Sequence, residues 1–493
     1  MALAACGGQA TPEPAQEVFQ PTQAPATQPP AATEAPAEVE APAATEAPAE
    51  AEAPAEPEVP EVELFGDPIR GGVLYDKWWP PLGLDTPAGD HPLWATQSTN
   101  ARSGADTWRC KECHGWDYKG ADGAYGSGSH FTGFAGVLSA VDKGPGYVLG
   151  ALQGETDPDH DFSTVMDEQA LTDLALFILE ETMDYDPFVG PDKMALGGDL
   201  ALGEELFQDC ADCHGPQGTA INFKNVAEPE YVGGLAQDNP WEFLHKLRFG
   251  QPTEPDMPSA VDIGWSEDEQ LAVLAYAQSL PALSPVSEGG LLYDKWWKAL
   301  GAEEPEGDQP LWATQSSNAR SGADTWRCKE CHGWDYRGAD GAYGSGSHFT
   351  GFTGVLGAAS MSTEELSGWL NGAANPDHDF SAYLDDEQIN RLVTFMQEGL
   401  VDISLYINDD KTVNGDPQHG QTLYNAACKR CHGETGVGEA FVLSILANDN
   451  PWEVFHKISN GQPGEHMPAG VNFGWSPQDI ADLLSYAQTL PVE

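Results

Sequence analysis

Four stretches of the chain place hydrophobic residues three or four positions apart, which is the spacing of an amphipathic helix. They are residues 167–180 (DEQALTDLALFILE), 266–281 (SEDEQLAVLAYAQSLP), 385–398 (DDEQINRLVTFMQE) and 476–491 (SPQDIADLLSYAQTLP). Each carries an aromatic residue that we expect to pack in a core, namely Phe177, Tyr276, Phe395 and Tyr486. Ser266 with Glu269 predicts a capping box, and Pro477 after Ser476 predicts a helix start.

These helices fall into two pairs because the chain contains a long internal repeat. Tyr75/Tyr293, Cys110/Cys328 and Cys210/Cys428 are each 218 residues apart. Residues 91–138 and 309–356 differ at only four positions, which are His91/Gln309, Thr99/Ser317, Lys119/Arg337 and Ala135/Thr353. Elsewhere the two copies differ much more. Either this patch was duplicated by local exchange, or both copies must keep the same surface and cavity.

The N-terminal segment has the composition of a tether. Residues 9–64 are rich in Ala, Pro, Glu and Thr, and no Lys or Arg precedes Arg70. Such a segment buries too little surface to offset its chain entropy, so we expect a disordered acidic linker over residues 1–64. The string LAAC, ending at Cys6, resembles a bacterial lipobox and implies lipidation of Cys6. The basic and apolar segments that usually precede a lipobox are missing here. Either the true start codon lies upstream, or the resemblance is accidental.

The charge of the chain limits its partners. It carries 78 acidic and 22 basic residues, a formal net charge of −56. Phosphate would be repelled, which excludes nucleic acid as a partner. A redox partner protein with a basic docking patch fits this charge better. No run approaches the roughly 18 apolar residues that a membrane-spanning helix needs.

Eight of the nine cysteines lie in four CxxCH strings. These are Cys110–His114, Cys210–His214, Cys328–His332 and Cys428–His432, with the second cysteines at Cys113, Cys213, Cys331 and Cys431. Residues at i, i+3 and i+4 share one face of a helix, so two thiols can form thioethers with a porphyrin while the histidine binds its iron. The strings predict four covalently bound haem c groups.

Zinc ribbons and thiol–disulfide motifs also contain CxxC, but neither requires the trailing histidine. A disulfide scaffold rarely spaces every cysteine by three. All four strings carry the histidine, so covalent haem attachment accounts for them better than these alternatives.

The residues around these strings resemble class I cytochromes c over residues 95–490. A glycine and an aromatic precede each attachment string, namely Gly203/Phe207, Gly420/Tyr424, Gly104/Trp108 and Gly322/Trp326, the last two in a frame that is one residue shorter. The resemblance implies an all-α fold in which the helices at the two ends of each module cross at these positions. It implies cytochrome c-like modules over residues 65–187, 188–284, 285–405 and 406–493, that is, two tandem dihaem repeats.

The same family pattern places a methionine before the last helix as the second axial ligand of the iron. Met257 in EPDMPSA and Met467 in EHMPAG occupy this place in the second and fourth modules. A thioether raises the potential of a haem relative to bis-histidine ligation. His466, beside Met467, is a minor alternative. We expect His245 and His456, on the preceding helices, to pack or to contact propionates rather than to bind iron.

The first and third modules lack a shared methionine, because Met166 corresponds to Leu384. Their shared histidines are His160/His378 in PDHDFS and His130/His348 in GSGSHFTGF. His160 and His378 stand where the family's methionine would be, so we expect them to be the sixth ligands, with His130 and His348 as alternatives. His91 and His419 are expected at the surface.

If every iron has six ligands, no position is left for a substrate. The sequence then predicts a multihaem electron carrier, exported to the periplasm or outer cell surface and anchored to the membrane through Cys6. The alternative is a dihaem-repeat oxidoreductase, peroxidase-like or a sulfur-compound dehydrogenase, with one open haem. Since all eight CxxCH cysteines are used in thioethers, none is left to bind iron, and this favours the carrier over the enzyme. Polymerisation into a haem wire is a third, structural alternative.

Overall fold

The computed structural model of the protein describes residues 63–253, 257–437 and 442–492, which belong to one unit of the chain. Residues 1–62, and with them Cys6 and nearly all of the predicted tether, lie outside the described residues. No helix among the described residues is long and apolar enough to span a membrane.

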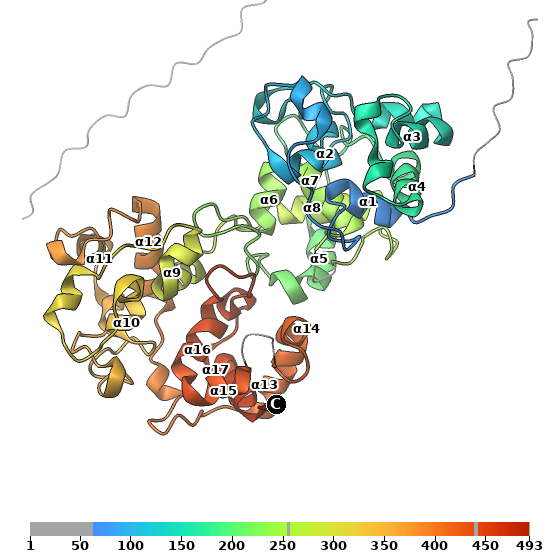
Figure 1. The fold of residues 1–493 in the computed structure, drawn as a ribbon. Helices are drawn as coiled ribbons and strands as arrows, with labels where there is room; N and C mark the ends of the chain where they lie inside the picture. Colours follow the sequence, from blue (N-terminus) through green and yellow to red (C-terminus); the bar gives the residue numbers. More distant parts are fainter. Residues whose placement is uncertain (1–62, 254–256, 438–441, 493) are drawn as a thin grey trace, which may run out of the picture. The chain divides into compact units, whose positions relative to one another are not determined.

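The described residues form helices joined by loops and contain no strand, which confirms the predicted all-α fold (Figure 1). The helices of the first repeat are α1 (Pro68–Asp76), α2 (Cys110–His114), α3 (Pro145–Leu152), α4 (Glu168–Leu176), α5 (Leu200–His214), α6 (Val232–Asp238), α7 (Pro240–Phe249) and α8 (Glu267–Ala277). Those of the second repeat are α9 (Pro285–Leu300), α10 (Cys328–His332), α11 (Thr363–Leu370), α12 (Asp386–Thr394), α13 (Pro417–Leu423), α14 (Lys429–His432), α15 (Leu443–Asp449), α16 (Pro451–Asn460) and α17 (Pro477–Thr489).

The four amphipathic helices predicted from the sequence are α4, α8, α12 and α17. The capping box of Ser266 and Glu269 is present at the start of α8, and Ser476 forms another with Asp479 at the start of α17. After α4 and α12 the chain makes one π-helical turn, over Phe177–Glu181 and Phe395–Gly399. Their buried aromatic residues lie in the core, as expected.

In the second and fourth modules the end helices cross where the sequence predicts. Gly203 on α5 lies against the backbone carbonyl of Ala272 on α8, where a Cβ atom would overlap it. The ring of Phe207 then contacts that of Tyr276, with centroids 5.5 Å apart. The corresponding rings of Tyr424, directly after α13, and Tyr486 on α17 have centroids 5.4 Å apart. The glycine permits the close approach, and the aromatic pair fills the space beside it.

For the first and third modules this prediction is wrong. Gly104 begins a 3₁₀ turn with φ +68° and has no neighbour within 4 Å of a Cβ position, so it makes no helix crossing. The crossing is made by α1 instead, where Gly71 lies against the carbonyl of Asp173. The ring centroids of Tyr75 and Phe177 are 5.2 Å apart.

The third module repeats this arrangement with Gly289 and Tyr293 on α9, where the rings of Tyr293 and Phe395 are 5.6 Å apart. Gly322 and Trp326, like Gly104 and Trp108, belong to a 3₁₀ turn. The correct glycine–aromatic pair stands about 30 residues upstream of the one that the sequence suggested, in GGVLYDKWW and GGLLYDKWW. The crossing forms only where the closing helix packs against the glycine. The local spacing of a glycine and an aromatic residue does not show where that happens.

Each repeat has a core shared by its two modules. One cluster of buried side chains extends from Leu74 in α1 to Leu280 after α8, and a second from Leu292 in α9 to Ala487 in α17, with Val226 added from the first repeat. The packing unit is therefore the two-module repeat. The boundaries of the single modules stay predictions.

A buried histidine joins the two modules of each repeat. His245 on α7 is fully buried; its Nε2 lies 3.0 Å from the carbonyl of Gly72, and its Nδ1 lies 2.8 Å from the hydroxyl of Tyr118. A carbonyl only accepts, so Nε2 carries the proton and Tyr118 donates to Nδ1. Burial lowers the pKa of His245 to about 3, which keeps it neutral.

His456 makes the same two bonds in the second repeat, at 2.7 Å to Tyr336 and 3.1 Å to Gly290. The packing role expected for His245 and His456 is confirmed. Tyr118 and Tyr336 have φ of +63° and +61°, a left-handed backbone that is unusual for an aromatic residue. Both lie in the nearly identical stretch, so that stretch is also an intermodule surface.

A buried carboxylate adds charge to this junction. Asp76 at the end of α1 pairs with Arg109, which precedes the attachment string, and with Lys246 on α7 at 2.6 Å. Burial alone would raise the pKa of Asp76, but the attraction of Lys246 and Arg109 outweighs it and holds the pKa well below its usual range. Asp294 does the same in the second repeat with Arg327 and Lys457, and its pKa is about 2.

Replacing this carboxylate should weaken the repeat. We expect Asp76→Asn to cost about 3–5 kcal/mol, because Arg109 and Lys246 would be left without a buried counter-charge. Because the pKa of Asp76 is lower in the folded than in the unfolded state, its carboxylate stabilises the fold fully only above the unfolded pKa of about 3.9. The stability lost in the variant should therefore shrink as the pH falls below about 4. Thermal unfolding measured against pH tests this, with Asp122→Asn at an exposed position as the control. Equal deficits for the two variants would contradict it.

Candidate haem sites

The attachment strings of the first and third modules form short helices of their own. α2 and α10 each begin at the first cysteine and end at the histidine, which puts both thiols and the imidazole on one side. The eight CxxCH cysteines are free thiols. Burial raises the pKa of Cys110 and Cys113 to about 12, which keeps them protonated. Unpaired thiols at this spacing fit thioether attachment to a porphyrin.

In the first module the structure brings the rings of His114 and His160 close together. Their ring centroids are 6.1 Å apart and their planes are nearly perpendicular, at 83°. His160 ends a short 3₁₀ turn, Pro158–His160, that is capped by the side chain of Asp157. The third module repeats the arrangement, with 6.2 Å between the centroids of His332 and His378.

The four imidazoles are held by their Nδ1 atoms. His114 Nδ1 lies 2.6 Å from the carbonyl of Ala135, and His160 Nδ1 lies 3.0 Å from that of Ala151. His332 and His378 make equivalent contacts with the carbonyls of Thr353, at 2.7 Å, and Trp369, at 2.9 Å. Since a carbonyl can only accept, each Nδ1 carries a proton and each Nε2 keeps its lone pair.

The ring separations are compatible with one metal ion between each pair. Two imidazoles that bind one ion from opposite sides at about 2.0–2.1 Å have centroids about 6 Å apart. The observed separations of 6.1 and 6.2 Å match that value. Burial, followed by the repulsion of His160, lowers the pKa of His114 to about 4, and burial likewise lowers that of His332 to about 4. A neutral imidazole is the form that binds a metal. The residues therefore fit a haem with two histidine ligands.

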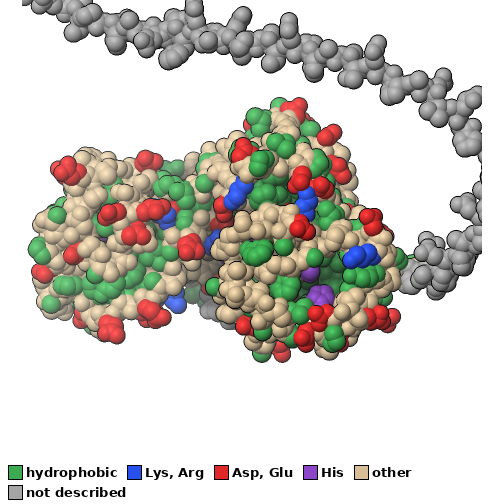
Figure 2. Space-filling model, turned by 90° about the horizontal axis from the view of Figure 1, so that it is seen from above, with side chains coloured by type: hydrophobic (Ala, Val, Ile, Leu, Met, Phe, Trp, Pro, Cys, Tyr) green, Lys and Arg blue, Asp and Glu red, His purple; other side chains and the backbone are tan. Residues whose placement is uncertain are grey.

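The space around each pair is lined mainly by hydrophobic side chains. In the first module Cys110, Cys113, His114, His160 and Phe162 line one cavity. In the third module the corresponding residues Cys328, Cys331, His332, His378 and Phe380 line another. Figure 2 shows histidine side chains inside a hollow bordered by hydrophobic ones, and carboxylates spread over the visible face. Such a lining suits a porphyrin and limits the access of water to it.

The alternative histidines make other contacts. His130 is exposed, and its ring contacts Tyr125 at 5.4 Å. His348 stacks on Tyr343 at 4.8 Å. Both therefore contact a tyrosine of their own loop.

His91 is not at the surface, contrary to expectation. It is 5% exposed, it stacks on Phe162 at 5.3 Å, and its ring centroid lies 6.2 Å from that of His160. Gln309 is equally buried in the third module. Both side chains accept a hydrogen bond from the backbone two residues later, which explains why the exchange is tolerated. The change to Gln309 had suggested a surface position, and the sequence held no other signal.

The second and fourth modules place the proximal histidine differently. His214 ends the long helix α5 and His432 ends α14, which follows a π-helical turn over Tyr424–Cys428. Burial lowers the pKa of His214 to about 4. Its Nδ1 is buried without a hydrogen-bond partner among the described residues. Its ring lies 5.7 Å from that of Phe223.

The two predicted methionine ligands lie in equivalent loops. Gly250, at the end of α7, has φ +86° and lies close to the carbonyl of Met257. Gly461, at the end of α16, has φ +89° and would place a Cβ atom 2.7 Å from the carbonyl of Met467. Glycine at both positions lets the loop fold back over the helix end. Both methionines are half-buried and stand outside the two core clusters.

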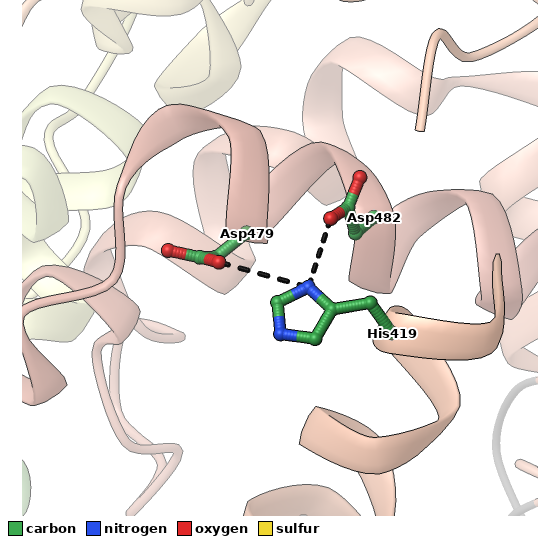
Figure 3. A group of neighbouring side chains, drawn as sticks. All are labelled: His419, Asp479 and Asp482. Atoms are coloured by element: carbon green, nitrogen blue, oxygen red, sulfur yellow. Dashed lines mark hydrogen bonds and ion pairs between the residues drawn. The ribbon is translucent and has the colours of Figure 1, made fainter. Parts of the chain in front are cut away.

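A further cluster of titratable groups lies on the fourth module (Figure 3). His419 is exposed, as expected, and its Nδ1 lies 2.9 Å from Asp482 and 3.7 Å from Asp479. Asp479 also caps α17 with Ser476, and Asp482 accepts a bond from the backbone of Asp416. These bonds join α13 to α17, so we interpret the cluster as a structural link between the helices.

The link should depend on pH. The hydrogen bond to Asp482 raises the pKa of His419, so its stabilising effect is complete below the unfolded pKa of about 6.5 and disappears as the pH rises through the folded value. We expect His419→Ala to lower the melting temperature at pH about 5.5 and to have little effect at pH about 9. Gln421→Ala, at an exposed position of the same helix, is the control. A deficit that does not vary with pH would contradict the link.

Known proteins resemble parts of the chain. Residues 415–486 match the family described as cytochrome c oxidase, cbb3-type, subunit III. This span includes Cys428, Cys431, His432 and Met467. A cytochrome c-553-like protein of Synechocystis sp. is 28% identical over 87 residues, which are 17% of this chain and 79% of that protein.

Among solved structures, the as-isolated form of thiosulfate dehydrogenase (TsdBA) from Marichromatium purpuratum aligns with 81% of this chain and 90% of its own. The identity is 15% and the TM-score is 0.19. A score this low does not establish a shared arrangement.

Proposed function

Because the chain is a class I c-type cytochrome, a family that binds haem c covalently, we propose that it holds four such groups and transfers electrons between redox proteins outside the cytoplasm. The observation that carries the proposal is the pairing of His114 with His160, repeated by His332 with His378. When bound, haem c supplies a one-electron ferric–ferrous couple, which accepts an electron from a reduced donor protein and passes it to an oxidised acceptor protein.

In the first and third modules, thioethers at Cys110/Cys113 and Cys328/Cys331 would attach the porphyrins. His160 and His378 are the proposed second axial ligands, in preference to His130 and His348. The ring separation supports this assignment. So do the Nδ1 bonds, because they occupy Nδ1 and leave the lone pair of each Nε2 for the iron. These bonds also raise the basicity of the imidazoles as ligands.

In the second and fourth modules, Cys210/Cys213 and Cys428/Cys431 would attach the porphyrins. His214 with Met257 and His432 with Met467 are the proposed axial pairs. Two observations support this assignment: both methionines are half-buried in a loop held on a helix-terminal glycine, and neither belongs to the core.

The four sites should divide into two classes by potential. Methionine–histidine ligation raises the reduction potential relative to bis-histidine ligation, so the second and fourth sites are expected to be reduced first. A pyridine haemochrome assay would count four haems per chain, and a spectropotentiometric titration would separate the classes. Fewer than four haems, or four equal midpoint potentials, would contradict the proposal.

Removal of one proposed ligand should open a single site. In His160→Ala the first haem loses its sixth ligand and is expected to bind carbon monoxide when reduced. His130→Ala is the matched control, because it removes a histidine of the same module that contacts Tyr125, and it should bind no carbon monoxide. The reverse result would assign the ligand to His130. Binding by the unaltered protein would support the alternative of an oxidoreductase with an open haem.

The partners follow from the charge of the chain. At a net charge of −56, a donor or acceptor with a basic docking patch would associate fastest at low ionic strength. We also propose a lipid anchor at Cys6 and a position in the periplasm or on the outer cell surface. The acidic segment after Cys6 would let the haem modules reach partners near the membrane.

A further inference from the structure

We propose that electrons cross between the two repeats directly from the second module to the fourth, so that the sites are arranged in the order 1–2–4–3 and not in chain order. The inference rests on the proposed function. The geometry points to it because the loop beside the proximal histidine of the second module contacts the methionine loop of the fourth.

One connection between the two loops runs through His466. Its Nδ1 lies 3.1 Å from the carbonyl of Asn222, and the next residue is the proposed ligand Met467. Asn222 precedes Phe223, whose ring lies 5.7 Å from that of His214. One hydrogen bond and one ring contact therefore lie between the proximal ligand of the second site and the methionine of the fourth.

Asn472 makes a second connection a few residues later. Its side-chain amide donates 2.5 Å to the carbonyl of Thr219 and 3.0 Å to Ser287, and it accepts from Ser284 at 2.7 Å. A Cβ atom on Gly215, the residue after His214, would lie 2.7 Å from the carbonyl of Asn472. The backbone beside His214 is thus in contact with the fourth module.

A loop that takes part in this contact is longer in the second module than its counterpart in the fourth. In both modules a loop is closed by a backbone bond, from Val232 to Gly218 and from Leu443 to Gly436. The loop between the bonded residues has 13 residues in the second module and 6 in the fourth, so it is seven residues longer in the second. The longer loop contains Asn222 and Phe223.

The same loop of the second module also reaches the third module, but away from its candidate site. Val226 bonds to Ala299 on α9 and accepts a bond from Arg391 on α12. None of these three residues lines the cavity that holds His332 and His378. The contact with the fourth module involves a neighbour of a proposed ligand, whereas the contact with the third does not.

Within each repeat the Tyr118–His245 and Tyr336–His456 bonds join the remaining pairs of modules. The resulting order puts the two methionine–histidine sites in the middle and a bis-histidine site at each end. Exchange with outside partners is then expected at the first and third modules.

An electron on one redox site makes reduction of a neighbouring site less favourable. This lowering of the neighbour's midpoint potential can be measured. In Met257→His only the fourth site keeps a methionine–iron absorption band, and in Met467→His only the second does. Each variant therefore yields the midpoint potential of one site while its neighbour stays oxidised. In the unaltered protein, one of these two sites is reduced after the other. Its equilibrium constant for reduction should be about threefold or more lower than in the variant in which its neighbour stays oxidised.

The two variants must report the same interaction, because coupling is reciprocal, so either suffices if the other fails to load haem. The pyridine haemochrome assay checks that four haems remain. The order is overturned if the wild-type titration of the methionine band equals the sum of the two single-variant curves. Fewer than four haems, or no methionine band in the unaltered protein, would instead overturn the proposed function itself.

Discussion

Four hydrogen bonds from imidazole Nδ1 atoms to backbone carbonyls determine what the first and third sites can bind. Each bond fixes the tautomer, so that Nε2 keeps the lone pair that a metal ion would use. Without the bond to the carbonyl of Ala151, the ring of His160 could rotate about its side-chain torsions and lose its alignment with His114. The rest of the module, including the α1–α4 crossing and the buried Asp76 network, holds the segments that supply these carbonyls.

These bonds also show which parts of the site could be predicted from the sequence. The CxxCH strings specify the attachment residues by spacing alone, and the place of His160 ahead of the closing helix identified it as a ligand candidate. The acceptors could not be predicted, because they are backbone atoms. Ala135 is replaced by Thr353 and Ala151 by Trp369, yet both carbonyls keep their role. When a residue contributes only its backbone carbonyl, the type of its side chain does not reveal that role.

The fold shows the same limit. The closing helices and their caps follow from local hydrophobic spacing and were predicted correctly. The first helix of the odd-numbered modules was placed wrongly, since Gly104/Trp108 and Gly71/Tyr75 have the same local pattern and differ only in what they meet in space. His91 was misplaced for a related reason: its exchange for Gln309 keeps a buried capping bond and says nothing about exposure.

The two-module repeat explains the near-identity of residues 91–138 and 309–356. Besides attaching the proposed haem, this stretch supplies Tyr118 and Tyr336, whose hydroxyls meet His245 and His456 of the next module. Substitutions there would have to satisfy a cofactor pocket and an intermodule junction together. The longer loop that contains Asn222 and Phe223 lies outside this stretch and takes part in the contact between the repeats.

The central claim is that the chain holds two bis-histidine and two methionine–histidine haems. Near-infrared magnetic circular dichroism of the fully oxidised protein tests it most directly, because each axial ligand pair has its own charge-transfer band. The account predicts two bands, one for bis-histidine and one for methionine–histidine ligation, each arising from two haems. A single class of band, or a high-spin signal from the unaltered protein, would contradict it.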